Sequence, residues 1–294
     1  AMAASLHPVH VEAAGEEQDA RGERAAAACS SGARAVDGEE VRYDLHAPLG
    51  EEVRGGALFL HGFAGGRAAL AHHARAVAAG GAAALAVDLS SLTRGGTFRE
   101  VFVDRSVRSA QLRNVRQAVD HVLCLDRQPC ALVGHSAGGA VALEAAVALQ
   151  EAGRPPAAVV LLDAVPFDAT PEVLTRFNLG TTELVSIRAD PSAWNKQGAI
   201  DEALRRVPPG PPGRLQRLRV RGARHADPME PSAAFRLVGL QGAGIEAFRR
   251  LLAAHLGRAL ALPGTEPPEA ALAALQPLAA AEDAGDGAPS SPRK

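Results

Sequence analysis

The sequence predicts an α/β fold in which helices cover both faces of a mostly parallel central sheet, without a large cap domain. Between about residues 41 and 260, short apolar runs alternate with longer amphipathic segments. Alternation of this kind is typical of parallel strands joined by helical crossovers. With 294 residues, 47% of them hydrophobic, the chain can also bury one large core.

The expected elements follow from these runs. The segment VRYDLH alternates polar and apolar residues like an edge strand, whereas ALFL, AALAV and AVVLL are apolar throughout, as strands buried on both faces should be. In chain order, strands are expected at 41–46, 57–60, 83–87, 130–133, 158–162, 183–187 and 215–220, and helices at 68–79, 106–123, 140–150 and 244–260.

A single domain is expected over residues 39–262, between two flexible tails. Residues 1–38 mix Ala, Gly, Glu and Arg without hydrophobic periodicity, and residues 263–294 are rich in Ala and Pro. The first tail lacks the apolar stretch of a signal peptide and is too acidic for an organelle transit peptide.

Composition gives little support to several classes of partner. The net charge of −2 provides no electrostatic case for binding nucleic acid. No apolar run reaches about 18 residues, so no transmembrane segment is expected. The oligomeric state cannot be inferred from these features.

The cysteines and phosphate motifs point to no metal and no cofactor. Cys29, Cys124 and Cys130 lack the paired spacing of a zinc site, although a bridge between Cys124 and Cys130 stays open. The chain contains neither a Gly-rich phosphate loop after a strand nor an HExxH motif.

The segment GHSAG at 134–138 lies between an apolar strand and an alanine-rich helix. This arrangement predicts the nucleophile elbow of the α/β-hydrolase fold, with Ser136 as nucleophile. Glycines two residues before and after the serine are needed because side chains there would collide with neighbouring backbone. Strand, elbow and helix in this order make a chance glycine turn a poor explanation.

A second segment, His61-Gly62-Phe63, follows the strand at 57–60. In this fold the corresponding loop supplies one amide of the oxyanion hole, and the residue after the nucleophile supplies the other. We therefore expect the amides of Phe63 and Ala137 to face the oxygen that gains charge when an ester carbonyl becomes tetrahedral.

A serine nucleophile needs a histidine base, and the fold places it after the acid in the chain. Two histidines follow the elbow. His255 falls within a helical pattern, whereas His225 follows the strand at 215–220 and a short loop. His225 is therefore the expected base.

The acid is open between two residues on geometry alone. Asp163 ends the strand at 158–162, and Asp190 follows the strand at 183–187. Asp168 and Asp227 are less well placed relative to strand ends, and Asp88 precedes the serine.

Four segments resemble the chlorophyllase family, which are α/β-hydrolase serine esterases that remove the phytyl chain from chlorophyll. The matching segments are ALFLHGF at 57–63, LVGHSAGG at 132–139, LLDAVPFD at 161–168 and RGARHADPMEP at 221–231. The resemblance implies Asp163 as acid and His225 as base, and it suggests a plastid or cytoplasmic location.

The chain also departs from that family. Ala137 stands where the family has arginine, and LDA replaces LDP. The stretch IRADPSAWN at 187–195 is more similar to less studied algal and bacterial hydrolases.

The expected function is cofactor-independent, chlorophyllase-like hydrolysis of chlorophyll or another lipophilic small-molecule ester through an acyl-enzyme. The alternatives are a generic carboxylesterase and a non-catalytic ligand-binding protein on the same scaffold. Phe167, Trp194 and Met229 are candidate substrate-binding residues, although such residues can equally cover the core. The cleft walls are expected in loops 89–104, 166–182 and 191–212.

Overall fold

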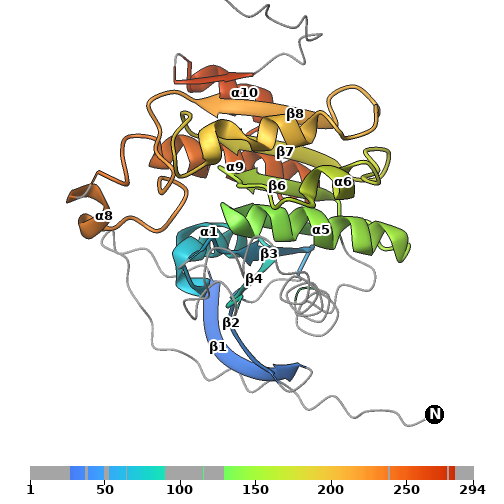
Figure 1. Cartoon of the computed structure of the whole chain (residues 1–294). Helices are drawn as coiled ribbons and strands as arrows, with labels where there is room; N and C mark the ends of the chain where they lie inside the picture. Colours follow the sequence, from blue (N-terminus) through green and yellow to red (C-terminus); the bar gives the residue numbers. More distant parts are fainter. Residues whose placement is uncertain are drawn as a thin grey trace, which may run out of the picture.

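The computed structural model describes residues 27–36, 39–49, 53–63, 65–89, 115, 129–237, 239–276 and 278–281. These residues form a nine-stranded sheet in the order β1-β2-β4-β3-β5-β6-β7-β8-β9 (Figure 1). The strands are β1 (Ala27–Val36), β2 (Glu39–Pro48), β3 (Gly56–Leu60), β4 (Ala83–Val87), β5 (Cys130–His135), β6 (Ala158–Leu162), β7 (Glu183–Arg188), β8 (Leu215–Val220) and β9 (Ala279–Ala281).

The centre of this sheet is parallel, as the sequence predicts. Strands β4, β3, β5, β6, β7 and β8 pair in parallel, whereas β2, β1 and β9 join antiparallel. The carboxyl ends of the six parallel strands therefore meet at one edge, where this fold places its ligands.

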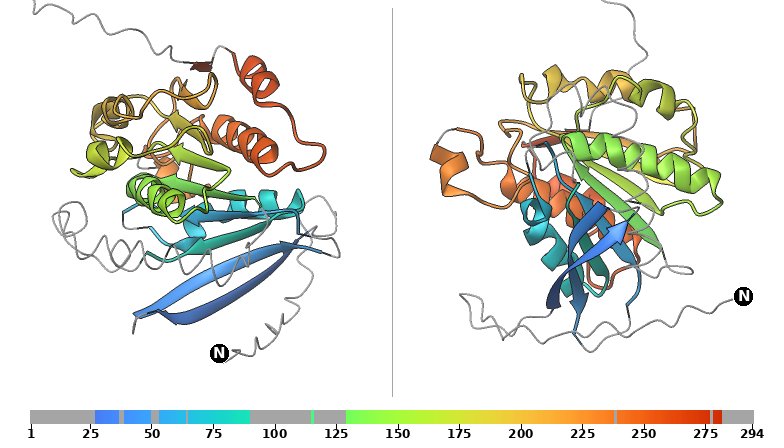
Figure 2. Two further views of the ribbon diagram at one scale, coloured as in Figure 1. Left: turned by 90° about the vertical axis from the view of Figure 1, so that its right-hand side faces the viewer. Right: turned by 60° about the horizontal axis from the view of Figure 1, so that its bottom comes forward.

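Helices cover both faces of the sheet (Figure 2). The α-helices α5, α6 and α7 lie on one face, and α1, α9 and α10 lie on the other. The helical segments are η1 (Arg67–Leu70), α1 (Ala71–Ala79), α5 (Ala137–Glu151), α6 (Thr170–Leu174), η2 (Lys196–Gly198), α7 (Ile200–Leu204), α8 (Ala233–Leu237), α9 (Ile245–Ala259) and α10 (Pro268–Ala274).

The two helical layers enclose two separate cores because side chains along a strand point alternately to opposite faces. In β3, Leu58 and Leu60 belong to the core under α5, whereas Ala57 and Phe59 belong to the core under α1 and α9. This explains why the central strands are apolar throughout.

The sheet and its helices extend beyond the expected boundaries at 39 and 262. β1 lies in the segment expected as an N-terminal tail, and α10 and β9 lie in the expected C-terminal tail. β1 has no apolar pattern that would mark it as a strand in the sequence. It is held in the sheet by pairing with β2 along its ten residues. Residues 1–26 and 282–294 and the expected helix at 106–123, apart from Val115, lie outside the described residues.

Two of the three cysteines can be assigned. Neither Cys29 nor Cys130 forms a disulfide, so the bridge between Cys124 and Cys130 is not formed. Burial raises the pKa of Cys130 to about 12. Cys124 lies outside the described residues.

Candidate active site

Ser136 joins β5 to α5 at a strained turn. Its φ is 54° and its ψ is −123°, a combination that is rare for residues other than glycine. A Cβ at Gly134 would collide with the backbone of Gly138, and one at Gly138 with the carbonyl of Leu60. The amide of Ser136 donates to the carbonyl of Leu162 over 3.1 Å. These contacts fix the serine at the carboxyl edge of the sheet.

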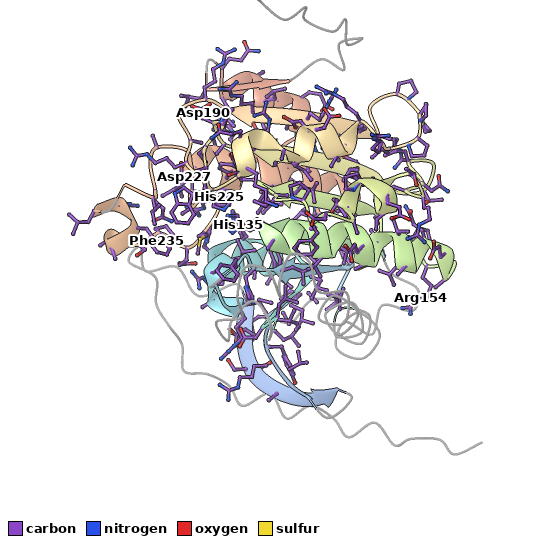
Figure 3. The ribbon with its side chains drawn as sticks, viewed as in Figure 1. His135, Arg154, Asp190, His225, Asp227 and Phe235 are labelled. Carbon is purple, nitrogen blue, oxygen red and sulfur yellow. The ribbon has the colours of Figure 1, made fainter. Side chains whose placement is uncertain are left out.

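The Ser136 hydroxyl lies 3.0 Å from Nε2 of His225, in the turn that follows β8. Nδ1 of the same ring lies 2.6 Å from Oδ2 of Asp163. Because a carboxylate only accepts hydrogen bonds, Nδ1 carries the hydrogen and Nε2 is left to accept from the serine. Figure 3 shows His225 beside His135, the residue that precedes the serine.

Asp163, and not Asp190, contacts His225. Asp163 follows β6 with a φ of 43°, and its side chain is 1% exposed. The Asp190 carboxylate instead lies 2.8 Å from the Arg219 guanidinium on β8 and accepts from the amide of Gly222 over 2.8 Å. The geometry therefore separates two residues that the strand pattern alone could not.

The remaining sequence candidates take other partners in the described part of the chain. Asp88 accepts from the amide and side chain of Arg67, Asp227 accepts from the amides of Arg224, Gly242 and Gly244, and His255 pairs with Glu183. Asp168 is exposed.

Sequence reasoning missed Asn195, which is 1% exposed. Its Nδ2 lies 3.0 Å and 3.2 Å from the two carboxylate oxygens of Asp163. The two residues are separated by 32 positions in the chain. The stretch 187–195 stood out by resemblance, but no residue pattern in it marks the asparagine as a partner of the acid.

The two expected oxyanion segments lie against each other. A Cβ placed on Gly62 would lie 2.8 Å from the Cβ of Ser136. Ala137 is the first residue of α5, so its amide has no helical carbonyl to bind. Phe63 directly follows Gly62, and its own side chain is 40% exposed.

His61 fixes the first of these segments. Its Nδ1 donates to the carbonyl of Gly62 over 2.7 Å, and its Nε2 accepts from the amide of Leu89 over 2.9 Å. Burial lowers the pKa of His61 below its ordinary value, which favours the neutral ring that these two roles require.

Two buried imidazoles hold the loop that carries His225. Nε2 of His135 donates to the carbonyl of His225 over 2.8 Å, and Nε2 of His73 on α1 donates to the carbonyl of Pro228 over 2.9 Å. Burial, with the nearby His225, lowers the pKa of His135 to about 3, and burial also lowers the pKa of His73. Both rings are therefore neutral and give their one N–H to the loop.

Glu230 ties the end of the same loop to α1. Its carboxylate accepts from the amide and the ring of His72 over 2.7 Å and 3.1 Å and pairs with Arg75 at 2.9 Å. Burial alone would raise the pKa of Glu230, but the hydrogen bonds from His72 and the charge of Arg75 lower it to about 2.

The candidate substrate-binding residues differ in their surroundings. Phe167 is 2% exposed and belongs to the core with α5 and α6. Trp194 is 64% exposed, one residue before Asn195, and Met229 is half-buried four residues after His225. The wall expected at 89–104 lies outside the described residues, apart from Leu89.

A cavity of about 340 Å³ lies between α1 and α9, lined by residues including His73, Val77 and Arg249. None of its lining residues is Ser136, Asp163 or His225. Over the described ranges, no three His, Cys, Asp or Glu side chains are grouped so as to hold a metal ion. No helix in those ranges is long and apolar enough to cross a membrane.

Solved structures of similar shape come from several organisms. Dienelactone hydrolase from Anabaena variabilis has 19% identity and a TM-score of 0.54, with 72% of this chain and 94% of that one covered. Carboxyl esterase 2 from the fungus Tuber melanosporum has 15% identity and a TM-score of 0.58, with coverage of 80% and 86%. The chain has the α/β-hydrolase fold.

Other comparisons concern one more solved structure and the sequence itself. An esterase from Pyrobaculum calidifontis shares the fold at 17% identity and a TM-score of 0.54, covering 79% of this chain and 85% of that one. The family model for the thioesterase domain matches residues 115–187, which include Ser136 and Asp163. A sequence comparison with curated proteins gives no match.

Proposed function

We propose that this chain is a serine carboxylic-ester hydrolase that works through an acyl-Ser136 intermediate. The observation that carries the proposal is the continuous hydrogen-bonded row from Asp163 through His225 to Ser136, with distances of 2.6 Å and 3.0 Å. The strained turn at Ser136 and the buried Asp163 add to it, because strain and buried charge are concentrated at functional sites.

In the acylation step, Oγ of Ser136 attacks the ester carbonyl while Nε2 of His225 takes the hydroxyl proton. The carbonyl oxygen gains a negative charge, which the amides of Phe63 and Ala137 would stabilise. When the C–O bond to the alcohol breaks, the imidazolium gives its proton to the leaving oxygen. The negative charge of Asp163 stabilises the transient imidazolium and keeps the hydrogen on Nδ1.

In the deacylation step, water replaces the alcohol. His225 removes a proton from water, the hydroxide attacks the acyl carbon, and the proton returns to Oγ of Ser136 as the ester bond breaks. The products are one carboxylic acid and one alcohol, and the protein ends in its starting state. No step requires a cofactor.

For the substrate, we propose a lipophilic ester of the chlorophyllase type. Support comes from the four sequence segments that resemble that family and from Trp194 and Met229, which lie near Asn195 and His225 in the chain. A generic carboxylesterase is the alternative. A thioester is a second candidate bond, favoured by the thioesterase-domain match at 115–187.

A fluorophosphonate probe tests the nucleophile. The native protein should be labelled once, and Ser136→Ala should lose at least 99% of the labelling, because the probe reacts only with an activated hydroxyl (~10³-fold or more separates the two states). Ser192→Ala is the matched control, since its buried hydroxyl has no hydrogen-bond partner among the described residues. Equal labelling of the native protein and Ser136→Ala would exclude the proposal, and the absence of labelling would favour the ligand-binding alternative.

Substrate choice is tested by comparing kcat/KM for chlorophyll, short p-nitrophenyl esters and acyl thioesters. The chlorophyllase-like proposal predicts that the pigment ester is the best of the three. If only short esters react, the pigment proposal is wrong, and a preference for acyl thioesters would assign the protein to the second candidate.

The acid is tested by Asp163→Asn and Asp190→Asn. Asp163→Asn should lower kcat by up to about 10⁴-fold, because an amide cannot hold the correct ring tautomer. Asp190→Asn should keep kcat within about threefold, because that side chain contacts Arg219 and Gly222 instead. A larger loss in Asp190→Asn would exclude this assignment.

A further inference from the structure

The side-chain amide of Asn195 is directed at the acid of the proposed triad. Its Nδ2 lies 3.0 Å from Oδ1 and 3.2 Å from Oδ2 of Asp163, and 2.9 Å from the carbonyl of Asp190. An amide nitrogen carries two hydrogens, so one serves the carboxylate and the other the carbonyl.

The orientation of this amide is determined by its other end. Oδ1 of Asn195 accepts from the amides of Ser192 over 2.8 Å and Gly198 over 3.1 Å. A flipped side chain would point its NH₂ group at two N–H donors and its oxygen at a carboxylate. Only the observed orientation satisfies every partner.

Asp163 requires such donors because its side chain is only 1% exposed. A buried carboxylate is costly unless hydrogen bonds replace the water that it lost. His225 supplies one donor at Oδ2, and the amide of Ala189 supplies another at Oδ1 over 2.9 Å. In the described part of the chain, two side chains donate to Asp163, and these are His225 and Asn195.

We infer that Asn195 is a positioning residue for Asp163: it fixes the plane of the carboxylate so that Oδ2 faces Nδ1 of His225, and it stabilises the negative charge. Two donors at Oδ1, one from Ala189 and one from Asn195, prevent the carboxylate from rotating. This inference rests on the proposed ester hydrolysis, because Asn195 acts on the reaction only through Asp163 and His225.

Among the residues that the structure describes, two other titratable groups lie close to this pair. The ring of His135 lies 5.0 Å from that of His225, centre to centre, and is neutral. The Asp190 carboxylate is paired with Arg219 and contributes only its backbone carbonyl to Asn195. A change at Asn195 therefore acts chiefly on Asp163 and His225.

The decisive variant is Asn195→Asp, which keeps the shape and the oxygen that binds Ser192 and Gly198 but replaces the donor by a second carboxylate oxygen. Two carboxylates in contact cannot both ionise freely. The two carboxylates and the His225 ring together should therefore hold an extra proton near neutral pH. We expect the acid limb of kcat/KM to move upward by about one pH unit or more and kcat at pH 7 to fall about tenfold or more.

Two further variants complete the design. Asn195→Ala removes the donor without adding charge, and it should lower kcat about tenfold with a smaller change in the pH profile. Asn178→Asp is the matched control, because Asn178 also accepts from an amide, that of Gly180 over 2.8 Å, but in an exposed turn. It should keep the native pH profile.

A measurement on the native protein serves if the variants do not fold. The side-chain amide resonances of Asn195, followed by ¹H–¹⁵N NMR, should shift with pH in step with the titration of the His225 ring. Resonances that stay constant while the ring titrates would overturn the inference, as would an Asn195→Asp profile identical to the native one.

The outcomes also separate this inference from the proposed function. If the native protein hydrolyses no ester, the proposed function is wrong, and the NMR titration still decides whether Asn195 responds to the Asp163–His225 pair. If the native protein hydrolyses esters and Asn195→Asp does so with an unchanged pH profile, only the role of Asn195 is wrong.

Discussion

At the residue scale, Gly62 is a position where one methyl group should disturb the site. A Cβ there would lie 2.8 Å from the Cβ of Ser136 and 3.2 Å from Nδ1 of His135. Gly62→Ala should therefore displace the Phe63 amide and lower kcat/KM about 10²-fold, since a shift of about 1 Å has that effect. Steady-state kinetics with an activated ester measures it.

Gly153→Ala provides the comparison. Gly153 has a φ of 73° but open space around its Cα, so alanine should lower the free energy of unfolding by about 1 kcal/mol and leave kcat/KM unchanged. If Gly62→Ala kept native activity, the close approach of the His61–Phe63 segment to Ser136 would have no role in catalysis.

His135 gives a pH dependence of stability at the same scale. The unfolded ring takes up a proton near its ordinary pKa of 6.5, whereas the folded ring does so only near 3. Between these values the unfolded state binds more protons, so stability is highest above pH 6.5 and falls as the pH is lowered.

His135→Gln should reduce this loss, because glutamine keeps an N–H donor for the carbonyl of His225 but does not titrate. We expect the fall in Tm between pH 6.5 and pH 4 to shrink by about 2–4 °C or more relative to the native protein, as followed by circular dichroism. An unchanged slope would show that His135 is not the neutral buried ring described above.

At the scale of elements, sequence patterns predicted the parallel strands well and the peripheral elements poorly. β4, β6 and β8 begin and end at the expected residues, because β4 and β6 are apolar throughout and β8 alternates along its length. β1 reads AACSSGARAV and carries no such signal; it is specified by pairing with β2. Long-range pairing leaves no local mark in a sequence.

The candidate site shows the same division. The order of serine, acid and histidine after strand ends selected Ser136 and His225 as candidates, and the structure places their side chains 3.0 Å apart. Asp163 and Asp190 both follow strands, and resemblance was needed to choose between them. The structure separates them because only one carboxylate reaches the His225 ring. Asn195 and Glu230 act through contacts between distant segments, which residue spacing cannot express.

At the same scale, the contact between Glu230 and α1 predicts a pH dependence of stability, because Glu230 joins the His225 loop to the first turn of α1. Its pKa is lowered, so its contribution to stability is present above the ordinary value of 4.5 and is lost as the pH falls toward about 2. Glu230→Gln should lower Tm at pH 7 by about 2–4 °C, and this difference should shrink below pH 4.5 and be largely lost near pH 2.

Glu246→Gln is the control, since that carboxylate is 75% exposed and lies 3.4 Å from Arg249 on the surface of α9. It should leave Tm nearly unchanged at both pH values. A Tm difference for Glu230→Gln that persisted at low pH would show that the loop is not held by the charge.

At the scale of the whole molecule, the C-terminal boundary of the folded domain depends on which residues cover the core under α1 and α9. Ala271 of α10 and Leu275, which directly follows this helix, belong to the core under α9, and Glu266 binds Arg250 through both carboxylate oxygens at 2.6 Å. β9 pairs with β8, which would otherwise be the edge of the sheet. We therefore place the end of the folded domain beyond residue 262.

Two truncated chains test this placement. A chain ending at residue 262 should be less stable by about 2–4 kcal/mol, because it exposes the edge of β8 and the core residues of α9 that Ala271 and Leu275 cover, and Tm should fall by about 5–10 °C. A chain ending at residue 281 keeps every described contact and should match the native Tm. Because neither truncation touches Ser136 or His225, the folded fraction of both should keep native kcat/KM, and a native Tm in the shorter chain would return the boundary to 262.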